Sequence, residues 1–173
     1  MQQVEEREPS VLKPIPKPTS YELVVVVDNV RSAFNVGAIL RTSECLGVGR
    51  VVLCGITPGI DNASVLKAAV GAEKNLQIEA NPSILDVLPG LQKDGYAIWA
   101  LELGTNAEPV NTLVKCPNKL ALVIGNERCG VDGKVLQMAN KVIYIPMFGQ
   151  KNSLNVEVSF GIALGFIAQL PFG

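Results

Sequence analysis

The sequence predicts a single α/β domain in which helices flank a mostly parallel β-sheet. Its length of 173 residues suits one domain with one well-formed core. Short apolar runs rich in valine and isoleucine recur along the chain, as in strands buried on both faces of a sheet, and segments with helical spacing lie between them. Hydrophobic residues make up 48% of the chain and aromatic residues only 5%, so the core must consist mainly of aliphatic side chains.

The chain is expected to begin with a flexible, proline-rich arm over residues 1–20, followed by the folded domain over residues 21–173. Four prolines stand among charged residues in the arm, a composition that buries little apolar surface. Lys13 and Lys17 would suit a contact with a polyanion, but a solvated lead-in is the preferred interpretation.

Five apolar runs in the domain are expected to form strands. Each is short and bounded by Gly, Asn or Pro, and they cover residues 21–27, 51–54, 96–101, 120–124 and 142–145. Helices are expected over residues 36–46, 82–92 and 131–139, with a buried helix in the apolar stretch 154–170. Because ligands of such sheets bind beyond the carboxyl ends of the strands, the segments that directly follow strands form the candidate site.

Composition and charge exclude several kinds of chemistry. The formal net charge of −1 gives no overall attraction to a polyanion, so RNA binding would need a local basic patch. The chain has no histidine, which removes the commonest general base and metal ligand, and no metal site is expected. The four cysteines show no C-x-x-C spacing, which favours a reduced, cytoplasmic setting. No apolar signal segment is visible and Glu157 interrupts the longest apolar stretch, so no membrane association is expected.

The segment after the first strand carries the densest group of polar side chains. Five of them lie within eight residues and lead into the first helix: Asp28, Asn29, Arg31, Ser32 and Asn35. On that helix Gly37 and Arg41 are one turn apart, and the missing side chain at Gly37 would leave room beside the guanidinium for a phosphate or a ribose. The pattern by itself slightly favours a polar turn with Ser32 or Asn35 as N-cap and Arg41 on a solvated face.

Two further segments follow later strands. Residues 125–130 place a glycine at each end of a turn, which lets the backbone approach a ligand closely, although a simple tight turn fits about as well. Residues 145–155 form a polar loop before the apolar helix, and Ser153 or Asn155 would also serve as its cap. On the helix, Gly161 and Gly165 would permit close packing against another element, such as a second subunit. These segments indicate a small-ligand site without naming the ligand.

Read together, the three segments resemble the three sequence motifs of the SpoU (TrmH-like) family of RNA 2′-O-ribose methyltransferases in the SPOUT superfamily. The motifs read, in order: Asn29-x-Arg31-x-x-x-Asn35-x-Gly37-x-x-x-Arg41, then Gly125-x-Glu127-x-x-Gly130, then Ile145-Pro146-Met147 through Ser153-Leu154-Asn155-Val156. The resemblance spans roughly residues 22–170, and three spaced motifs in this order are far more specific than any one of them.

The resemblance implies S-adenosylmethionine as cofactor and RNA as substrate. It also implies a deep trefoil knot near the carboxyl end, which the general rule against knotted chains would not predict. Cofactor binding carries over to six residues that follow three of the strands: Leu101, Glu102, Gly125, Ile145, Ser153 and Leu154. Backbone groups are expected to provide much of this binding.

Five residues carry over as catalytic: Arg41, Asn35, Glu127, Ser153 and Asn155. Because a guanidinium stays protonated, Arg41 is expected to position a phosphate and the ribose hydroxyl rather than to act as a base. Arg31 joins Arg41 as a candidate RNA contact. Asn35 and Asn155 are expected to orient groups in the site, and Glu127 is expected to be a buried anchor for the loops.

A homodimer through the knotted region is also implied, and it would bring Arg41 of one subunit toward the cofactor of the other. Glu157 and Ser159 depart from the residues that the family usually has after the third motif, so the contacts of that helix are not carried over.

The expected activity is methyl transfer to a ribose 2′-hydroxyl of RNA. tRNA is preferred over rRNA because no added RNA-binding module is visible. One alternative is a protein that keeps the cofactor pocket and methylates nothing, which the low net charge would allow and the retained site residues argue against. The other is a small-molecule methyltransferase or nucleotide-binding domain, which would need a pocket closed to a polymer. The sequence does not name the modified nucleotide.

Overall fold

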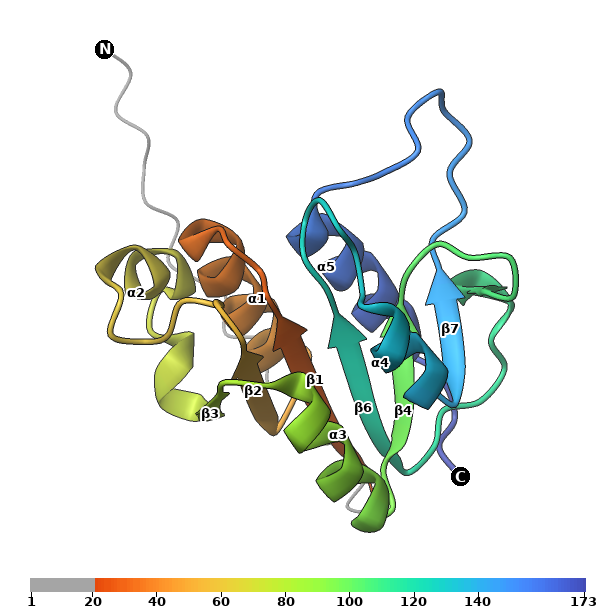
Figure 1. The fold of residues 1–173 in the computed structure, drawn as a ribbon, viewed down its shortest axis with the longest axis horizontal. Coiled ribbons are helices and arrows are strands. Elements are labelled where there is room, and N and C mark those ends of the chain that lie inside the picture. The colour runs from red at the N-terminus through yellow and green to blue at the C-terminus, as the bar shows by residue number, and fades with distance from the viewer. Residues whose placement is uncertain (1–20) are drawn as a thin grey trace, which may run out of the picture.

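The computed structural model of the protein describes residues 21–173. The predictions made for residues 1–20, including those for Lys13 and Lys17, lie outside the described residues. The α/β class predicted from the sequence is confirmed, because a parallel sheet lies between helices on both of its faces (Figure 1).

The sheet has seven strands in the order β3-β2-β1-β6-β4-β7-β5, and every neighbouring pair is parallel. The strands are β1 (Glu22–Asp28), β2 (Arg50–Cys54), β3 (Gln77–Asn81), β4 (Ala97–Leu101), β5 (Glu108–Pro109), β6 (Lys119–Ile124) and β7 (Lys141–Tyr144). At the centre, Val26 of β1 is in register with Val52 of β2 and Val123 of β6. A parallel sheet brings the carboxyl ends of all its strands to one edge, where the site is expected.

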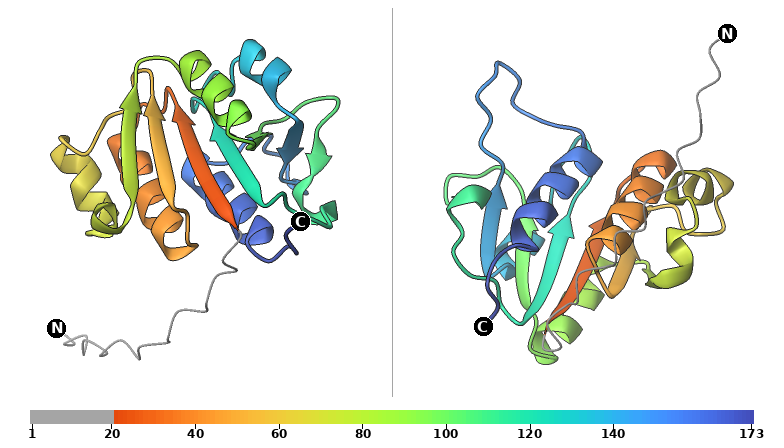
Figure 2. Two further views of the ribbon diagram at one scale, coloured as in Figure 1. Left: turned by 90° about the horizontal axis from the view of Figure 1, so that it is seen from below. Right: turned by 180° about the vertical axis from the view of Figure 1, so that it is seen from behind.

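Five α-helices cover the sheet: α1 (Ala33–Cys45), α2 (Ala63–Ala69), α3 (Ile84–Lys93), α4 (Gly133–Met138) and α5 (Val156–Ile167). Two short 3₁₀ turns, η1 (Ala72–Asn75) and η2 (Val110–Thr112), complete the regular structure of the described residues. Helices α1 and α5 lie on one face and α3 and α4 on the other, as the two opposite views show (Figures 1 and 2).

The two faces of the sheet build two separate apolar cores. Alternate side chains of a strand point to opposite faces, so Val25 and Val27 of β1 pack in the core below α1 and α5. Val24 and Val26 pack in the core below α3 and α4. Phe160 of α5 is fully buried in the first core, which explains why an apolar helix follows the third motif.

All five predicted strands form, but two strands and one α-helix escaped prediction. β3 has the sequence Gln-Ile-Glu-Ala-Asn and lies at the edge of the sheet, where a strand needs no continuous apolar run. Helix α2 has only seven residues and β5 only two, too short for a periodic pattern. The first helix begins earlier than predicted, at Ala33, because the Ser32 hydroxyl accepts a hydrogen bond from the Asn35 N–H and caps it.

No helix between residues 21 and 173 is both long enough and apolar enough to cross a membrane.

Candidate active site

The carboxylate of Glu127 joins the second motif to the first. It accepts hydrogen bonds from the backbone N–H groups of Arg31 and Ser32, both at 3.0 Å, and from the Asn35 side-chain amide at 3.1 Å. Glu127 lies on the loop after β6, and its three donors lie between β1 and the first turn of α1. One side chain therefore holds two loops in a fixed relation at the carboxyl edge of the sheet. The expected anchoring contacts are present, but the expectation that Glu127 is buried is wrong, because it lies at the exposed rim.

Asn155 joins the third motif to the same network. Its Oδ1 accepts hydrogen bonds from the N–H groups of Glu157 and Val158 and so caps α5. Its Nδ2 donates to Oδ1 of Asn35 at 3.2 Å. Asn155 is thus the cap of α5, and the same side chain contacts Asn35 of the first motif. The first turns of α1 and α5 are tied together through Asn35, which also contacts Glu127.

The loop of the second motif folds back on itself. The backbones of Asn126 and Gly130 exchange two hydrogen bonds, of 3.0 and 2.9 Å. A side chain at Gly125 would meet the Gly130 carbonyl, with the Cβ at 2.3 Å from its oxygen. The missing side chain at Gly125 is therefore required by the loop itself rather than only by a ligand. Gly130 has a φ of +70°, in the left-handed region that favours glycine.

Asn126 lines the pocket and belongs to the same network, although no sequence pattern singled it out. Its Nδ2 donates to the carbonyl of Asn29 at 2.7 Å, and its Oδ1 accepts from the N–H groups of Arg128 and Cys129. Asn29 itself adopts a left-handed backbone, with a φ of +56°. An asparagine beside a glycine in a turn signals loop structure in the sequence, but it does not reveal which strand end the amide will contact.

A pocket of about 200 Å³ opens beside this network. All six residues predicted to bind the cofactor line it: Leu101, Glu102, Gly125, Ile145, Ser153 and Leu154. The loops after β4, β6 and β7 thus converge, as expected for strand ends on one edge. Met147 and Tyr144 also line the pocket and were missed, although Met147 belongs to the quoted third motif.

Glu102 lines the pocket and binds two backbone N–H groups beside it. Its carboxylate accepts hydrogen bonds from the N–H groups of Val131 at 2.8 Å and Leu103 at 2.7 Å. A side chain at Gly130 would meet this carboxylate, so the glycine lets β4 and the second motif approach each other closely.

Two carboxyl groups at this edge have shifted pKa values of opposite sign. Burial alone would raise the pKa of Glu127, but the hydrogen bonds from Arg31, Ser32 and Asn35 outweigh it and lower the pKa. Burial raises the pKa of Asp28, which the hydrogen bond from Asn29 opposes and the nearby charge of Asp132 reinforces. Glu127 is therefore held as a carboxylate, the form that can accept all three of its hydrogen bonds.

The structure does not bring Arg41 to the pocket. Arg41 is exposed on α1, does not line the pocket, and makes no side-chain hydrogen bond or ion pair within residues 21–173. The side chain of Arg31 is exposed as well, and only its backbone N–H takes part in the network. In the described chain, both arginines are free to meet an external anion.

The expectation that Gly37 makes room for a ligand beside Arg41 is wrong. Gly37 is buried, and a Cβ there would lie 2.4 Å from the Val65 carbonyl oxygen and 2.6 Å from the Ala68 Cβ. The absent side chain lets α1 and α2 pack closely. The two glycines of α5 are less constrained than Gly37. A Cβ at Gly161 would make an ordinary contact with Thr42 at 3.7 Å, and a Cβ at Gly165 would meet nothing within 4 Å.

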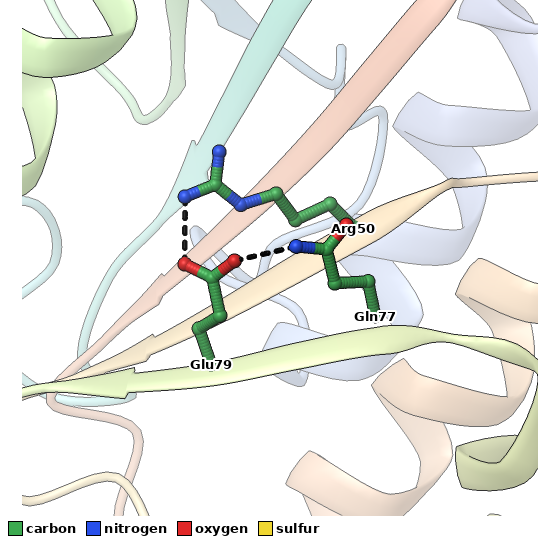
Figure 3. Close-up of polar contacts among 3 residues, drawn as sticks. All are labelled: Arg50, Gln77 and Glu79. Carbon is green, nitrogen blue, oxygen red and sulfur yellow. Dashed lines mark hydrogen bonds and ion pairs between the residues drawn. The ribbon is translucent and has the colours of Figure 1, made fainter.

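A second hollow, of about 250 Å³, lies between β2, β3 and α3. It contains the ion pair between Arg50 Nη2 and Glu79 Oε2 at 2.7 Å, and Gln77 donates to the other oxygen of Glu79 at 2.7 Å (Figure 3). None of the residues quoted for the three motifs lines this hollow.

Comparisons with known proteins agree on one kind of relative. The family model described as "SpoU rRNA Methylase family" matches residues 22–165. The chain is 30% identical over 141 residues to the Bacillus subtilis 23S rRNA (guanosine(2553)-2'-O)-methyltransferase RlmP, covering 80% of this chain and 55% of that protein. It is also 30% identical over 143 residues to the Escherichia coli tRNA (guanosine(18)-2'-O)-methyltransferase, covering 83% of this chain and 61% of that protein.

A solved structure agrees in fold. The AdoMet-bound rRNA methyltransferase from Sinorhizobium meliloti superposes with a TM-score of 0.77 at 27% identity, covering 84% of this chain and 55% of that one. The chain thus spans little more than half the length of these relatives.

Proposed function

The chain belongs to the SpoU rRNA methylase family, and we propose that it transfers a methyl group from S-adenosylmethionine to a ribose 2′-hydroxyl of RNA. One observation carries the proposal: Glu127, Asn35 and Asn155 tie the three motif loops together beside a pocket at the carboxyl edge of the sheet. Relatives named as RNA 2′-O-methyltransferases support it.

The residues of the pocket fit the proposed cofactor. The walls include apolar side chains of Leu101, Ile124, Ile145 and Leu154, which suit a flat heterocycle. Polar groups lie beside them, among them Asn126 and Ser153, which suit ribose hydroxyls and an amino-acid group. When bound, S-adenosylmethionine would supply a methyl group activated by its sulfonium. Leu101, Glu102, Gly125, Ile145, Ser153 and Leu154 are the residues that we propose hold it.

We assign alignment, rather than proton abstraction, to the catalytic residues. Arg41 would hold a phosphate and the 2′-hydroxyl, because a guanidinium stays charged and offers several fixed donors. Asn35 and Asn155 would orient the reacting groups, and Ser153 would line the site. Glu127 would keep the loops in place through the backbone N–H groups that it binds. Correct alignment of oxygen and methyl carbon supplies several kcal/mol of rate enhancement, of order 7 or more in well-oriented reactions.

A homodimer would complete this site. Val158, Ile162 and Phe166 are 44%, 37% and 44% exposed, and their spacing places them on one side of α5, beside the open Gly165. Thr42 packs on Gly161 of the same helix, so Arg41 lies next to the proposed contact surface. A partner docked there would receive Arg41 near its own pocket. Ile162→Asp is expected to convert a dimer to a monomer in light scattering, and a monomeric wild type would contradict the proposal.

We also propose the deep trefoil knot at the carboxyl end. The path of residues 145–155, which lead from β7 out beyond the edge of the sheet and back to α5, supports it (Figure 1). So does the end of the chain, where Pro171 accepts from the Cys116 N–H at 2.9 Å and Gly173 donates to the Cys116 carbonyl at 3.1 Å. A bulky folded protein fused after Gly173 is expected to slow refolding from urea, since it would have to pass through a loop. An unchanged rate would argue against the knot.

The activity assay uses purified protein, labelled S-adenosylmethionine, and unmodified tRNA or rRNA, with mass spectrometry to map ribose methylation. Transfer to tRNA is expected. rRNA is the alternative substrate, because relatives named for tRNA and for rRNA match the chain about equally. Cofactor binding without transfer to any RNA would contradict the enzyme proposal and favour a silent binding protein.

A further inference from the structure

The loop between β7 and α5 carries an aromatic side chain that the site described so far does not use. Phe148 is 97% exposed, the highest value among the large apolar side chains of the described residues. Burying a phenylalanine stabilises a fold by about 1.5–3 kcal/mol, so an aromatic ring left in water contributes nothing to the folding of this chain. Both faces of the ring are therefore open to an external contact.

Phe148 directly follows a residue that lines the pocket. Its neighbour Met147 lines the pocket, and consecutive Cα atoms are only about 3.8 Å apart. Leu103 and Leu154 line the same pocket and are 47% and 42% exposed, so the mouth has an apolar rim. Residues 145–155 project beyond the carboxyl edge of the sheet (Figure 1).

Two cations lie near this rim, and the two carboxylates that also line the pocket, Glu102 and Glu127, are bound by backbone N–H groups. Arg128 lines the pocket, Lys151 follows Phe148 by three residues, and both are exposed. Neither side chain makes a hydrogen bond or ion pair to another residue in the part of the chain that the structure describes. Residues 145–155 contain no acidic side chain. An exposed aromatic ring together with unpaired cations near one pocket is a combination that binds an unstacked base and its phosphates.

We propose that Phe148 is the stacking platform for the base of the nucleotide that is methylated, with Arg128 and Lys151 beside its phosphates. This inference rests on the proposed function. A base is joined to the ribose that presents the 2′-hydroxyl, so a ring one residue outside the pocket lies within its reach. Stacking would hold the nucleotide out of its helix and the hydroxyl toward the methyl donor.

The test compares variants that keep or remove the aromatic ring. Phe148→Leu is expected to lower kcat/KM for unmodified tRNA by about 10- to 100-fold, mainly through KM, because stacking on an aromatic side chain contributes that much per base. Phe148→Tyr and Phe148→Trp should stay within about threefold of wild type, since both keep a ring face. Val114→Ala is the matched control: Val114 is 82% exposed and does not line the pocket.

A second readout is independent of methyl transfer. The only tryptophan, Trp99, is 4% exposed, so a new tryptophan in Phe148→Trp reports on position 148. Its fluorescence should be quenched by tRNA and not by heparin, a polyanion without bases. Quenching by both, or by neither, would overturn the stacking proposal.

Three further outcomes would also overturn it. They are wild-type kinetics in Phe148→Leu, a loss of S-adenosylmethionine affinity in that variant, and a change of its oligomeric state. The second would make Phe148 a cover of the cofactor pocket, and the third a subunit contact. If wild-type protein transfers no methyl group to RNA, the proposed function fails, and the fluorescence of Phe148→Trp still decides whether position 148 meets a base.

Discussion

Glu127 and Glu79 each accept hydrogen bonds beside a hollow of similar size, but from donors of different kinds. Glu127 binds two backbone N–H groups and an amide that lie 92 to 96 residues away in the sequence. Glu79 binds only side chains, from Arg50 on the neighbouring strand and Gln77 on its own. A carboxylate that holds backbone groups fixes the path of a loop, whereas one that holds flexible side chains leaves the backbone unchanged. The hydrogen bonds of Glu127 therefore constrain the loops beside its hollow, and those of Glu79 do not.

The sharpest test of this contrast replaces Arg41 of the first motif and Arg50 of the second hollow, each with alanine. Arg41→Ala is expected to lower kcat by about 1,000-fold while leaving cofactor affinity and stability nearly intact, because Arg41 has no partner among the described residues and its proposed role is alignment. Arg50→Ala should leave transfer within about twofold and reduce the free energy of unfolding by about 1 kcal/mol or less, as for a partly exposed ion pair. Steady-state kinetics, calorimetric titration of the cofactor and urea unfolding measure these effects. A collapse of cofactor binding in Arg41→Ala would mean that Arg41 has been misplaced.

The next largest effect is expected at the carboxylates themselves. Glu127→Gln puts an amide NH₂ against donor groups and leaves part of the loop without an acceptor, at a cost of about 1–3 kcal/mol. Methyl transfer should fall on the order of 100-fold, and the melting temperature should fall too. Glu79→Gln is the matched change and should leave transfer unaffected. Equal losses in both variants would remove the distinction between the two regions.

A third experiment asks whether the first motif serves packing as well as the site. Gly37→Ala should reduce the free energy of unfolding by about 1–3 kcal/mol, because the new methyl group meets the backbone of Val65 and Ala69. Gly49→Ala is the control, since a Cβ there meets nothing within 4 Å. Urea unfolding measures both. If Gly37→Ala kept full stability and lost only RNA affinity, the ligand interpretation of Gly37 would be restored.

The smallest expected effect is a pH dependence. The pKa of Glu127 is lower in the folded protein than its unfolded value of about 4.3, so its stabilising contribution is complete above that value and is lost as pH falls through the folded pKa. The difference in unfolding midpoint between wild type and Glu127→Gln should therefore shrink as pH falls from about 5 to about 3. A difference that stays constant over this range would show that Glu127 does not contribute as a carboxylate.

The sequence alone predicted the central strands of the sheet and the approach of the three motif loops to one another. Buried runs such as residues 23–27 mark parallel strands, and parallel strands place the segments after them at one edge. It was not sufficient for β3, whose polar sequence at the sheet edge carries no apolar period. It also gave the wrong role to Gly37, because a glycine suits a ligand and a neighbouring helix equally well until the partner of that face is known.

Asn155 shows how strongly one position in such a loop is constrained. Its oxygen serves as acceptor for two N–H groups of α5 while its nitrogen serves as donor to Asn35. Aspartate or serine would keep the acceptor, but aspartate has no proton to donate as a carboxylate, and serine is shorter with one hydroxyl for both tasks. Neither substitution therefore preserves both interactions, and each is expected to weaken the contact between the first turns of α1 and α5. The start of the last helix is thus linked to the start of the first through a single amide.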